Sequence, residues 1–262
     1  MNQVPERTFM QKYHLKGIGW TIIFILLLFL SSVMTEVNWG GFFSNLGQFF
    51  ALLGRMANPD WQYTNIVVQP IIETIQMALL GTTLGTLVAV PFAFLAARNL
   101  VKSPLVRGGI RFFLNLVRTL PDLLLAALFV AIVGIGPTAG VWTLAVFSFG
   151  MISKLFYETV ETIDSGPIEA LQAAGANRVQ IIAFAVVPQV VNNFVSYFLY
   201  TFEINVRAST VLGYLGAGGI GVFLQRSLSS FRYDQTAVII IAILLVVVVI
   251  DGLSNILREK LL

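Results

Sequence analysis

The sequence predicts an all-α polytopic membrane protein with six transmembrane helices. Of its 262 residues, 57% are hydrophobic and 11% are charged, about half the charge of an ordinary soluble domain. Several uncharged runs reach the roughly 20 apolar residues that a helix needs to cross a bilayer. This composition excludes a soluble globular protein and a disordered chain. The chain contains no cysteine, which also excludes disulfides and thiolate metal sites.

The first expected span follows a basic flank and consists almost wholly of Ile, Leu and Phe at its centre. A cleaved signal peptide has a similar flank, but no small-x-small cleavage site follows, so we expect an uncleaved anchor. Residues 36–69 mix aromatic and polar side chains and are expected to lie at the membrane surface. The expected division is an anchor with an extracytoplasmic surface loop over 1–69 and a core over 70–262. The six spans are 17–35, 70–97, 112–133, 138–153, 181–205 and 235–257.

Small residues and turn residues indicate how the middle spans pack. A small-residue stripe at helical spacing in the second span predicts a close helix contact. Within the third span, Arg118 and Asp122 are four residues apart and predict a structural ion pair across Pro121. The Gly-Ile-Gly-Pro sequence at 134–137 predicts a tight reversal between two apolar runs. The stripe consists of Ala78, Gly81, Gly85 and Ala89.

The distribution of Lys and Arg predicts the orientation. Six spans place both termini on one side, and eleven of the sixteen Lys and Arg fall in segments on that side. Because Lys and Arg are enriched in cytoplasmic loops, both termini and the 154–180 loop are expected in the cytoplasm. The same residues are scattered without an aromatic pattern, which excludes nucleic acid as a partner. The basic segments are the N-terminus, 98–111, 154–180 and the C-terminus.

The charged 154–180 loop predicts a short helix, a glycine break and a second helix. Pro167 suits a first helical turn, and Glu169 suits the positive end of the helix dipole. Gly175 is expected to end the first helix in the left-handed region. The alanines of this helix would form a slim face that another protein could approach closely. These are Ala170, Ala173 and Ala174.

This loop resembles that of permease subunits of ATP-binding-cassette importers, which carry Glu-Ala-Ala, three residues, Gly, nine residues and Ile-x-Leu-Pro. Glu169, Ala170, Gly175 and Pro188 stand at the matching positions. In that family the loop forms a coupling helix that docks on an ATPase subunit. The resemblance therefore implies that Glu169, Ala170 and Gly175, within a coupling helix at about 166–180, contact such a subunit. The chain departs from the pattern at Leu171, Ala185 and Val187.

From about residue 70 to the C-terminus the chain also resembles the phosphonate importer permeases, in segments 118–122, 134–140, 154–158, 203–213 and 216–221. The resemblance implies a MetI-like fold and a homodimer in a bacterial plasma membrane. It also implies two ATP-binding subunits, an extracytoplasmic substrate-binding protein, and a phosphonate, phosphite or phosphate ester as cargo. The chain has no G-x-x-x-x-G-K-[ST] phosphate loop, so ATP and Mg²⁺ are expected on the partner. A permease for another small solute and a secondary transporter remain alternatives, although no inverted repeat is visible.

A glycine-rich stretch follows the fifth span. Gly216, Gly218 and Gly221 satisfy the dinucleotide motif G-x-G-x-x-G, but that motif needs a strand before it and a helix after it. Together with Gly219 they instead permit non-helical backbone at membrane depth, which is tolerated only where protein packs around it or water fills a cavity. The hypothesis is that this stretch lines or gates the exit mouth of a transport path.

Charged and polar residues near the end of the fifth span are candidates for the path itself. Glu203 and Arg207 are four residues apart, with Asn205 and Ser209 nearby, and intramembrane ionisable residues are usually functional. A structural ion pair is one interpretation. The alternative is that Arg207 faces the path and binds an oxyanion through its guanidinium group.

The remaining ionisable residues do not indicate a catalytic site or a metal site. Glu73 and Asp251 lie near span ends and are expected to be interfacial or interhelical hydrogen-bond partners. His14 stands without other His or Cys residues, so no metal site is expected. No nucleophile, base and acid set is recognisable, so the chain is not expected to be an enzyme.

Overall fold

A computed structural model describes residues 15–260, which are entirely helical apart from connections. The chain divides into two compact units at Gly54/Arg55. The first contains α2 (Leu15–Met34) and α3 (Trp39–Ser44), and α4 (Leu46–Met56) crosses the division. From residue 17 to residue 34 the side chains of α2 are mostly apolar and are exposed on nearly all sides, as expected of a helix surrounded by lipid.

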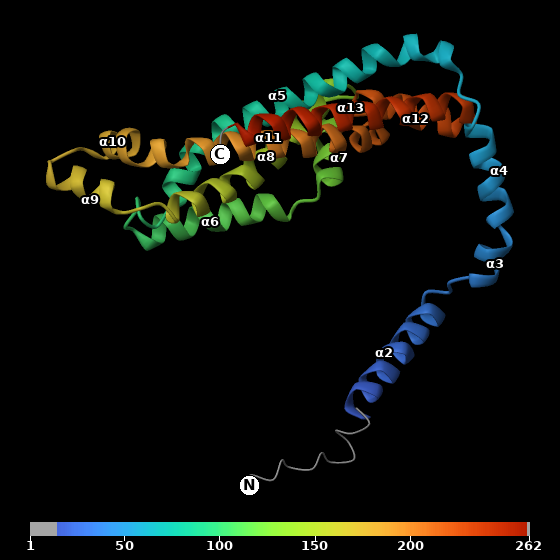
Figure 1. The fold of residues 1–262 in the computed structure, drawn as a ribbon, viewed down its shortest axis with the longest axis horizontal. Helices are drawn as coiled ribbons and strands as arrows, with labels where there is room; N and C mark the ends of the chain where they lie inside the picture. The colour runs from blue at the N-terminus through green and yellow to red at the C-terminus, as the bar shows by residue number, and fades with distance from the viewer. Residues whose placement is uncertain (1–14, 261–262) are drawn as a thin grey trace, which may run out of the picture. The chain divides into compact units, whose positions relative to one another are not determined.

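The second unit carries the long helices of the fold (Figure 1). In residues 15–260, five helical segments are long and apolar enough to cross a membrane, or six if a bent helix pair counts as one span. The predicted all-α membrane fold is therefore confirmed. The elements are η1 (Trp61–Tyr63), α5 (Thr64–Ala96), α6 (Pro104–Thr119), α7 (Asp122–Val133), α8 (Pro137–Glu161), α9 (Gly166–Ala173), α10 (Arg178–Ile181), η2 (Ile182–Val186), α11 (Val187–Leu212), η3 (Gly213–Leu215), α12 (Ile220–Ser229) and α13 (Tyr233–Glu259).

Helices α5 and α8 form the most extensive contact of this unit, and the predicted small-residue stripe makes it possible. All four stripe residues are buried. A Cβ on Gly81 would lie 2.5 Å from Cβ of Leu144, and one on Gly85 would lie 2.5 Å from the carbonyl oxygen of Ala145. The two backbones thus approach to a distance that only glycine allows.

The third predicted span, 112–133, is not one continuous helix in the structure. The structure has α6 and α7, which meet at an angle of 86°. Pro121 restricts the preceding residue to extended backbone, and Leu120 has φ −75° and ψ 121°. Arg118 and Asp122 consequently lie on different helices and form no ion pair in the part of the chain that is described. The Asp122 carboxylate instead accepts a 2.9 Å hydrogen bond from the Leu123 backbone N–H.

Three helices are longer than the hydrophobic runs that predicted them. Helix α5 begins at Thr64, so Pro70 lies inside it. Helix α8 continues beyond residue 153 to Glu161, because Phe156, Tyr157 and Val160 remain buried on one face while charged residues occupy the other. Helix α11 continues beyond residue 205 to Leu212. Apolar runs mark what lipid can surround, whereas the extensions of α8 and α11 each bury one face in protein.

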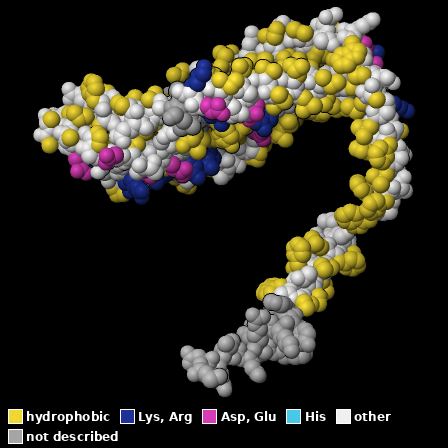
Figure 2. Space-filling model, viewed as in Figure 1, with side chains coloured by type: hydrophobic (Ala, Val, Ile, Leu, Met, Phe, Trp, Pro, Cys, Tyr) yellow, Lys and Arg dark blue, Asp and Glu magenta, His cyan; other side chains and the backbone are white. Residues whose placement is uncertain are grey.

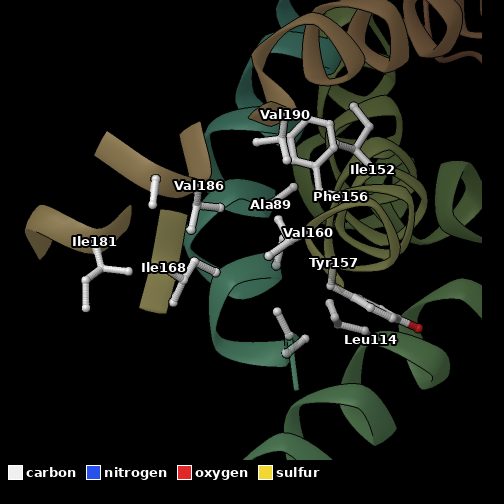
Figure 3. Close-up of a cluster of buried hydrophobic side chains, with 14 of the residues drawn as sticks. Ala89, Leu114, Ile152, Phe156, Tyr157, Val160, Ile168, Ile181, Val186 and Val190 are labelled. Atoms are coloured by element: carbon white, nitrogen blue, oxygen red, sulfur yellow. The ribbon is translucent and has the colours of Figure 1, made fainter. Parts of the chain in front are cut away.

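One hydrophobic cluster connects the α9–α10 hairpin to the helices that cross the membrane (Figure 3). Ile168 of α9 and Ile181 of α10 are buried at one end of it, beside Val186. Phe156 of α8 lies further in and stacks on Phe194 of α11, with ring centroids 3.6 Å apart. The hairpin is therefore packed against the ends of the spanning helices.

Candidate functional site

The predicted helix, glycine break and second helix over 166–180 are confirmed as α9, Gly175 and α10. Gly175 has φ +77°, the left-handed conformation that ends a helix. Its N–H donates to the carbonyl of Gln172 at 3.0 Å, and the N–H of Ala176 donates to Leu171 at 2.9 Å. Asn177 then begins α10 with a reciprocal capping box with Gln180. Two short helices with defined ends therefore project as a hairpin.

The hairpin buries one side and exposes the other. Ile168 and Ile181 are 6% and 8% exposed, whereas Glu169, Ala170 and Gly175 are exposed. The Ser165 hydroxyl donates a 2.9 Å hydrogen bond to the Glu169 carboxylate across the first turn of α9. The exposed side includes the small residues Ala170, Ala173 and Ala174 and carries one carboxylate, which suits close contact with another protein.

A cluster of charged residues around Glu161 joins the neighbouring helix ends, and it was not predicted from the sequence. Glu161, at the end of α8, forms an ion pair with Arg111 of α6 and accepts a 2.6 Å hydrogen bond from the Arg98 backbone N–H. Arg111 also donates twice to the carbonyl of Ala96, at 2.9 and 3.0 Å, and its guanidinium lies 4.6 Å from the Tyr157 ring centroid. The α5–α6 connection is thereby tied to α8.

Glu203 and Arg207 form the ion pair that their spacing predicts. Glu203 has a second partner on α13, since Arg258 lies 3.3 Å from its other oxygen. The Glu203 side chain is 7% exposed, while the Arg207 side chain is 54% exposed. One buried carboxylate thus faces two guanidinium groups, and the guanidinium of Arg207 keeps free surface on the outside of α11. The distant Arg258 could not be matched to Glu203 from spacing.

Asn205 and Ser209 lie on the buried side of α11. The Asn205 amide donates 2.7 Å hydrogen bonds to the hydroxyls of Thr82 on α5 and Ser148 on α8, while its amide oxygen has no partner. The Ser209 hydroxyl donates to the Val206 carbonyl within the helix at 2.8 Å. Neither side chain is accessible in the single chain. Asn205 therefore connects three spanning helices.

The glycine-rich stretch is a packed loop held by the first turns of α5. The Glu73 carboxylate accepts a 2.8 Å hydrogen bond from the Gly219 N–H, and the Thr74 hydroxyl accepts one of 2.8 Å from the Ile220 N–H. Glu73 is therefore an interhelical hydrogen-bond partner, as predicted. The Gly216 carbonyl accepts a 2.8 Å hydrogen bond from Gly136 in the α7–α8 turn.

The glycines of this loop fit where no other residue would. Gly216, Gly218 and Gly219 have φ between +71° and +82°, in the left-handed region that disfavours side chains. A Cβ on Gly218 would also lie 2.7 Å from the backbone of Pro137. Gly221 has no such φ, but a Cβ there would lie 2.0 Å from the Thr210 carbonyl oxygen. Protein packs around this non-helical backbone, one of the two expected situations.

The other candidate residues show no site chemistry. Asp251 accepts a 3.5 Å hydrogen bond from Asn255 within α13. His14 lies outside the described residues. Over residues 15–260 no group of three or more His, Asp or Glu side chains is placed to hold a metal ion.

Figure 2 shows the side-chain types on one face of the molecule. Hydrophobic side chains are densest over the part of the core that carries α12, while charged side chains gather over α6 and α9 and in the middle of this face. The part that carries α6 and α9 thus differs in polarity from the part that carries α12, as expected where helices leave a bilayer.

Residues 89–262 match the model of a family described as "Binding-protein-dependent transport system inner membrane component". The chain is 37% identical over 250 residues to the phosphite transport system permease protein PtxC of Stutzerimonas stutzeri, covering 93% of this chain and 91% of that protein. It is 42% identical over 212 residues to the phosphate-import permease protein PhnE of Mycolicibacterium smegmatis, covering 81% of this chain and 40% of the relative.

The fold is also found among solved structures. An inward-facing structure of the MetNI methionine ABC transporter has a chain that superimposes with a TM-score of 0.67 and 20% identity. The match covers 77% of this chain and 98% of that one, so the MetI-like fold is confirmed. The family match and the close relatives together show that the chain belongs to the inner membrane components of binding-protein-dependent transport systems, among the PhnE-like permeases of ATP-binding-cassette importers.

Proposed function

We propose that this chain forms the membrane path of an importer that carries a phosphonate, phosphite or related phosphorus oxyanion into the cytoplasm. The observation that carries the proposal is the exposed α9–Gly175–α10 hairpin, anchored by Ile168 and Ile181 to the spanning helices. The names of its relatives, which are phosphite and phosphate permeases, support this class of cargo. A permease for another small solute is the second candidate, since the fold is shared with a methionine transporter.

The hairpin would receive force from an ATP-hydrolysing partner that also binds ATP and Mg²⁺. Glu169, Ala170 and Gly175 are the proposed contact residues. Because Ile168 and Ile181 extend the hydrophobic cluster of α8 and α11, a displacement of the hairpin would move these helices between two packed arrangements. Two such partners, one for each of two copies of this chain, and an extracytoplasmic binding protein complete the proposed assembly. Both termini would be cytoplasmic, which the excess of Lys and Arg on that side supports.

The coupling role is tested in the full complex by Glu169→Lys. A lysine there places a positive charge where α9 offers a carboxylate, so we expect ATP hydrolysis to continue while uptake falls at least tenfold, or the ATPase to dissociate. Glu158→Lys is the matched control, because Glu158 is an exposed glutamate whose pairing with Lys154 on α8 contributes little to stability. Equal uptake in both variants would overturn the coupling assignment.

Arg207 is the proposed oxyanion contact along the path, because its guanidinium is more than half exposed while its partner Glu203 is buried. Asn205 and Ser209 would fix the position of α11 from its buried side. Arg207→Lys keeps the positive charge but loses the planar pair of donors. We expect phosphonate uptake to fall while stability is kept, with Arg226→Lys on α12 as the control. Full uptake by Arg207→Lys would leave Arg207 as a structural partner only.

The loop over Gly216, Gly218, Gly219 and Gly221 is the proposed gate. Because bulk at Gly218 would press on the Pro137 backbone, such a variant would report folding as well as gating. Glu73 offers a cleaner test, since it holds the loop by one hydrogen bond to Gly219. Glu73→Gln keeps an acceptor and should keep uptake, whereas Glu73→Leu should lower it. Unchanged uptake with Glu73→Leu would remove the gate proposal.

A further inference from the structure

A cavity lies between the end of α5, the α5–α6 connection and the α9–α10 hairpin. Its volume is about 580 Å³, within the range of ~300–1,000 Å³ typical of small-ligand pockets. One wall comes from the last turn of α5 and the residues after it, and the opposite wall from α9, α10 and the start of η2.

The cavity is basic, because Lys102 and Arg178 line it and no Asp or Glu is among its described lining residues. Both cations are exposed, and neither has an ion pair or a side-chain hydrogen bond in the described part of the chain. The nearby Arg98 and Arg111 are different, since both pair with Glu161. Two unpaired positive charges on opposite walls attract an anion.

The remaining lining is largely apolar. Phe94 and Leu95 contribute from α5, Leu100 from the connection, and Ile181 and Ile182 from the hairpin side. Leu95 remains 46% exposed. A ligand that satisfies both surfaces therefore has an anionic head and a hydrocarbon portion.

The place of the cavity in the fold specifies this ligand further. Helix α5 is one of the segments apolar enough to cross the membrane, and it ends at Ala96. The cavity begins in its last turn and extends to Lys102, so it lies where the helix leaves the bilayer. Basic pockets at this level on the cytoplasmic side are suited to anionic lipid head groups.

We propose that this cavity binds an anionic phospholipid, with the phosphate between Lys102 and Arg178 and the acyl chains along Phe94, Leu95 and Ile182. Such a lipid would join the α5–α6 connection to the hairpin. This lipid-binding proposal goes beyond the proposed transport function, because lipid binding requires only the folded chain and no cargo. A free phosphate ion offers the same charge but would leave the apolar wall uncovered.

The test uses the full-length chain purified in detergent, with lipid binding measured by native mass spectrometry during titration with phosphatidylglycerol or phosphatidylcholine. We expect preferential binding of phosphatidylglycerol, and a loss on the order of tenfold or more in affinity in the Lys102→Ala/Arg178→Ala double variant. Lys154→Ala/Lys260→Ala removes the same charge from a half-buried and an exposed position that do not line the cavity, and should bind like the wild type. Thermal unfolding of each variant verifies folding.

Three results would overturn the proposal. Equal phosphatidylglycerol affinity in the two double variants would show that the cavity cations do not bind the lipid. Displacement of the lipid by millimolar inorganic phosphate would assign the cations to a free anion. Unchanged lipid binding together with loss of the co-purifying ATP-hydrolysing subunit in Lys102→Ala/Arg178→Ala would assign the cavity to the subunit contact. Failure of transport in any variant bears only on the proposed function.

Discussion

Gly221→Ala is the substitution for which the structure gives the clearest expected magnitude. Gly221 lies in the first turn of α12, where α12 crosses the end of α11. A Cβ would lie 2.0 Å from the Thr210 carbonyl oxygen and 2.9 Å from Cα of Gly213. Real Cβ contacts below 3.0 Å essentially do not occur, so the Thr210 backbone would have to move by about 1 Å.

This movement cannot be absorbed by a side-chain rotation, because the atoms in contact are backbone. Overpacking in a well-packed core costs about 1–3 kcal/mol and occasionally more, and we expect the upper end here. Because a domain of about 150–250 residues loses roughly 2–4 °C of Tm per kcal/mol, Gly221→Ala should lower Tm by roughly 6–12 °C. The measurement is thermal unfolding of the detergent-solubilised chain, followed by tryptophan fluorescence.

Gly252→Ala is the matched control, since Gly252 lies inside α13 and a Cβ there would meet no atom within 4 Å. Alanine in an open helix interior is more favourable than glycine by about 0.5–1 kcal/mol. The same chemical change is therefore expected to raise Tm slightly at residue 252. A Gly221→Ala Tm within 2 °C of the wild type would refute the claim that the α11–α12 crossing requires glycine.

Two further substitutions test the polar contacts inside the core. Asn205→Ala removes hydrogen bonds to Thr82 and Ser148. Each such bond inside a membrane contributes about 0.6 kcal/mol on average and at most about 1.7 kcal/mol, so the Tm should fall measurably. An unchanged Tm would contradict the proposal that Asn205 connects three helices. Glu161→Gln removes the charge that pairs with Arg111, and since a charged hydrogen bond contributes about 1.5–3 kcal/mol, denaturant unfolding should show a loss of that order. If Glu161→Gln unfolds at the same denaturant concentration as the wild type, the charged cluster around Glu161 does not contribute to stability.

Local patterns predicted the helices and the hairpin correctly where the determining interactions are close in sequence. The left-handed conformation of Gly175 and the i, i+4 ion pair of Glu203 and Arg207 depend only on residues within one or two helical turns. The stripe that includes Gly81 and Gly85 was also readable, because small residues at helical spacing have few other uses inside a membrane. The bend at Pro121 was not predicted, because the apolar residues before and after it were assigned to one span.

The sequence by itself determined the class of fold, the positions of the apolar segments and the shape of the hairpin, because these follow from composition and from short-range backbone preferences. Only the tertiary structure decided which distant groups meet. It gave Glu203 a second guanidinium from Arg258, gave the Gly219 N–H an acceptor in Glu73, and brought Lys102 and Arg178 to one cavity. Such contacts depend on how helices pack, and packing is set by the whole core rather than by any local pattern.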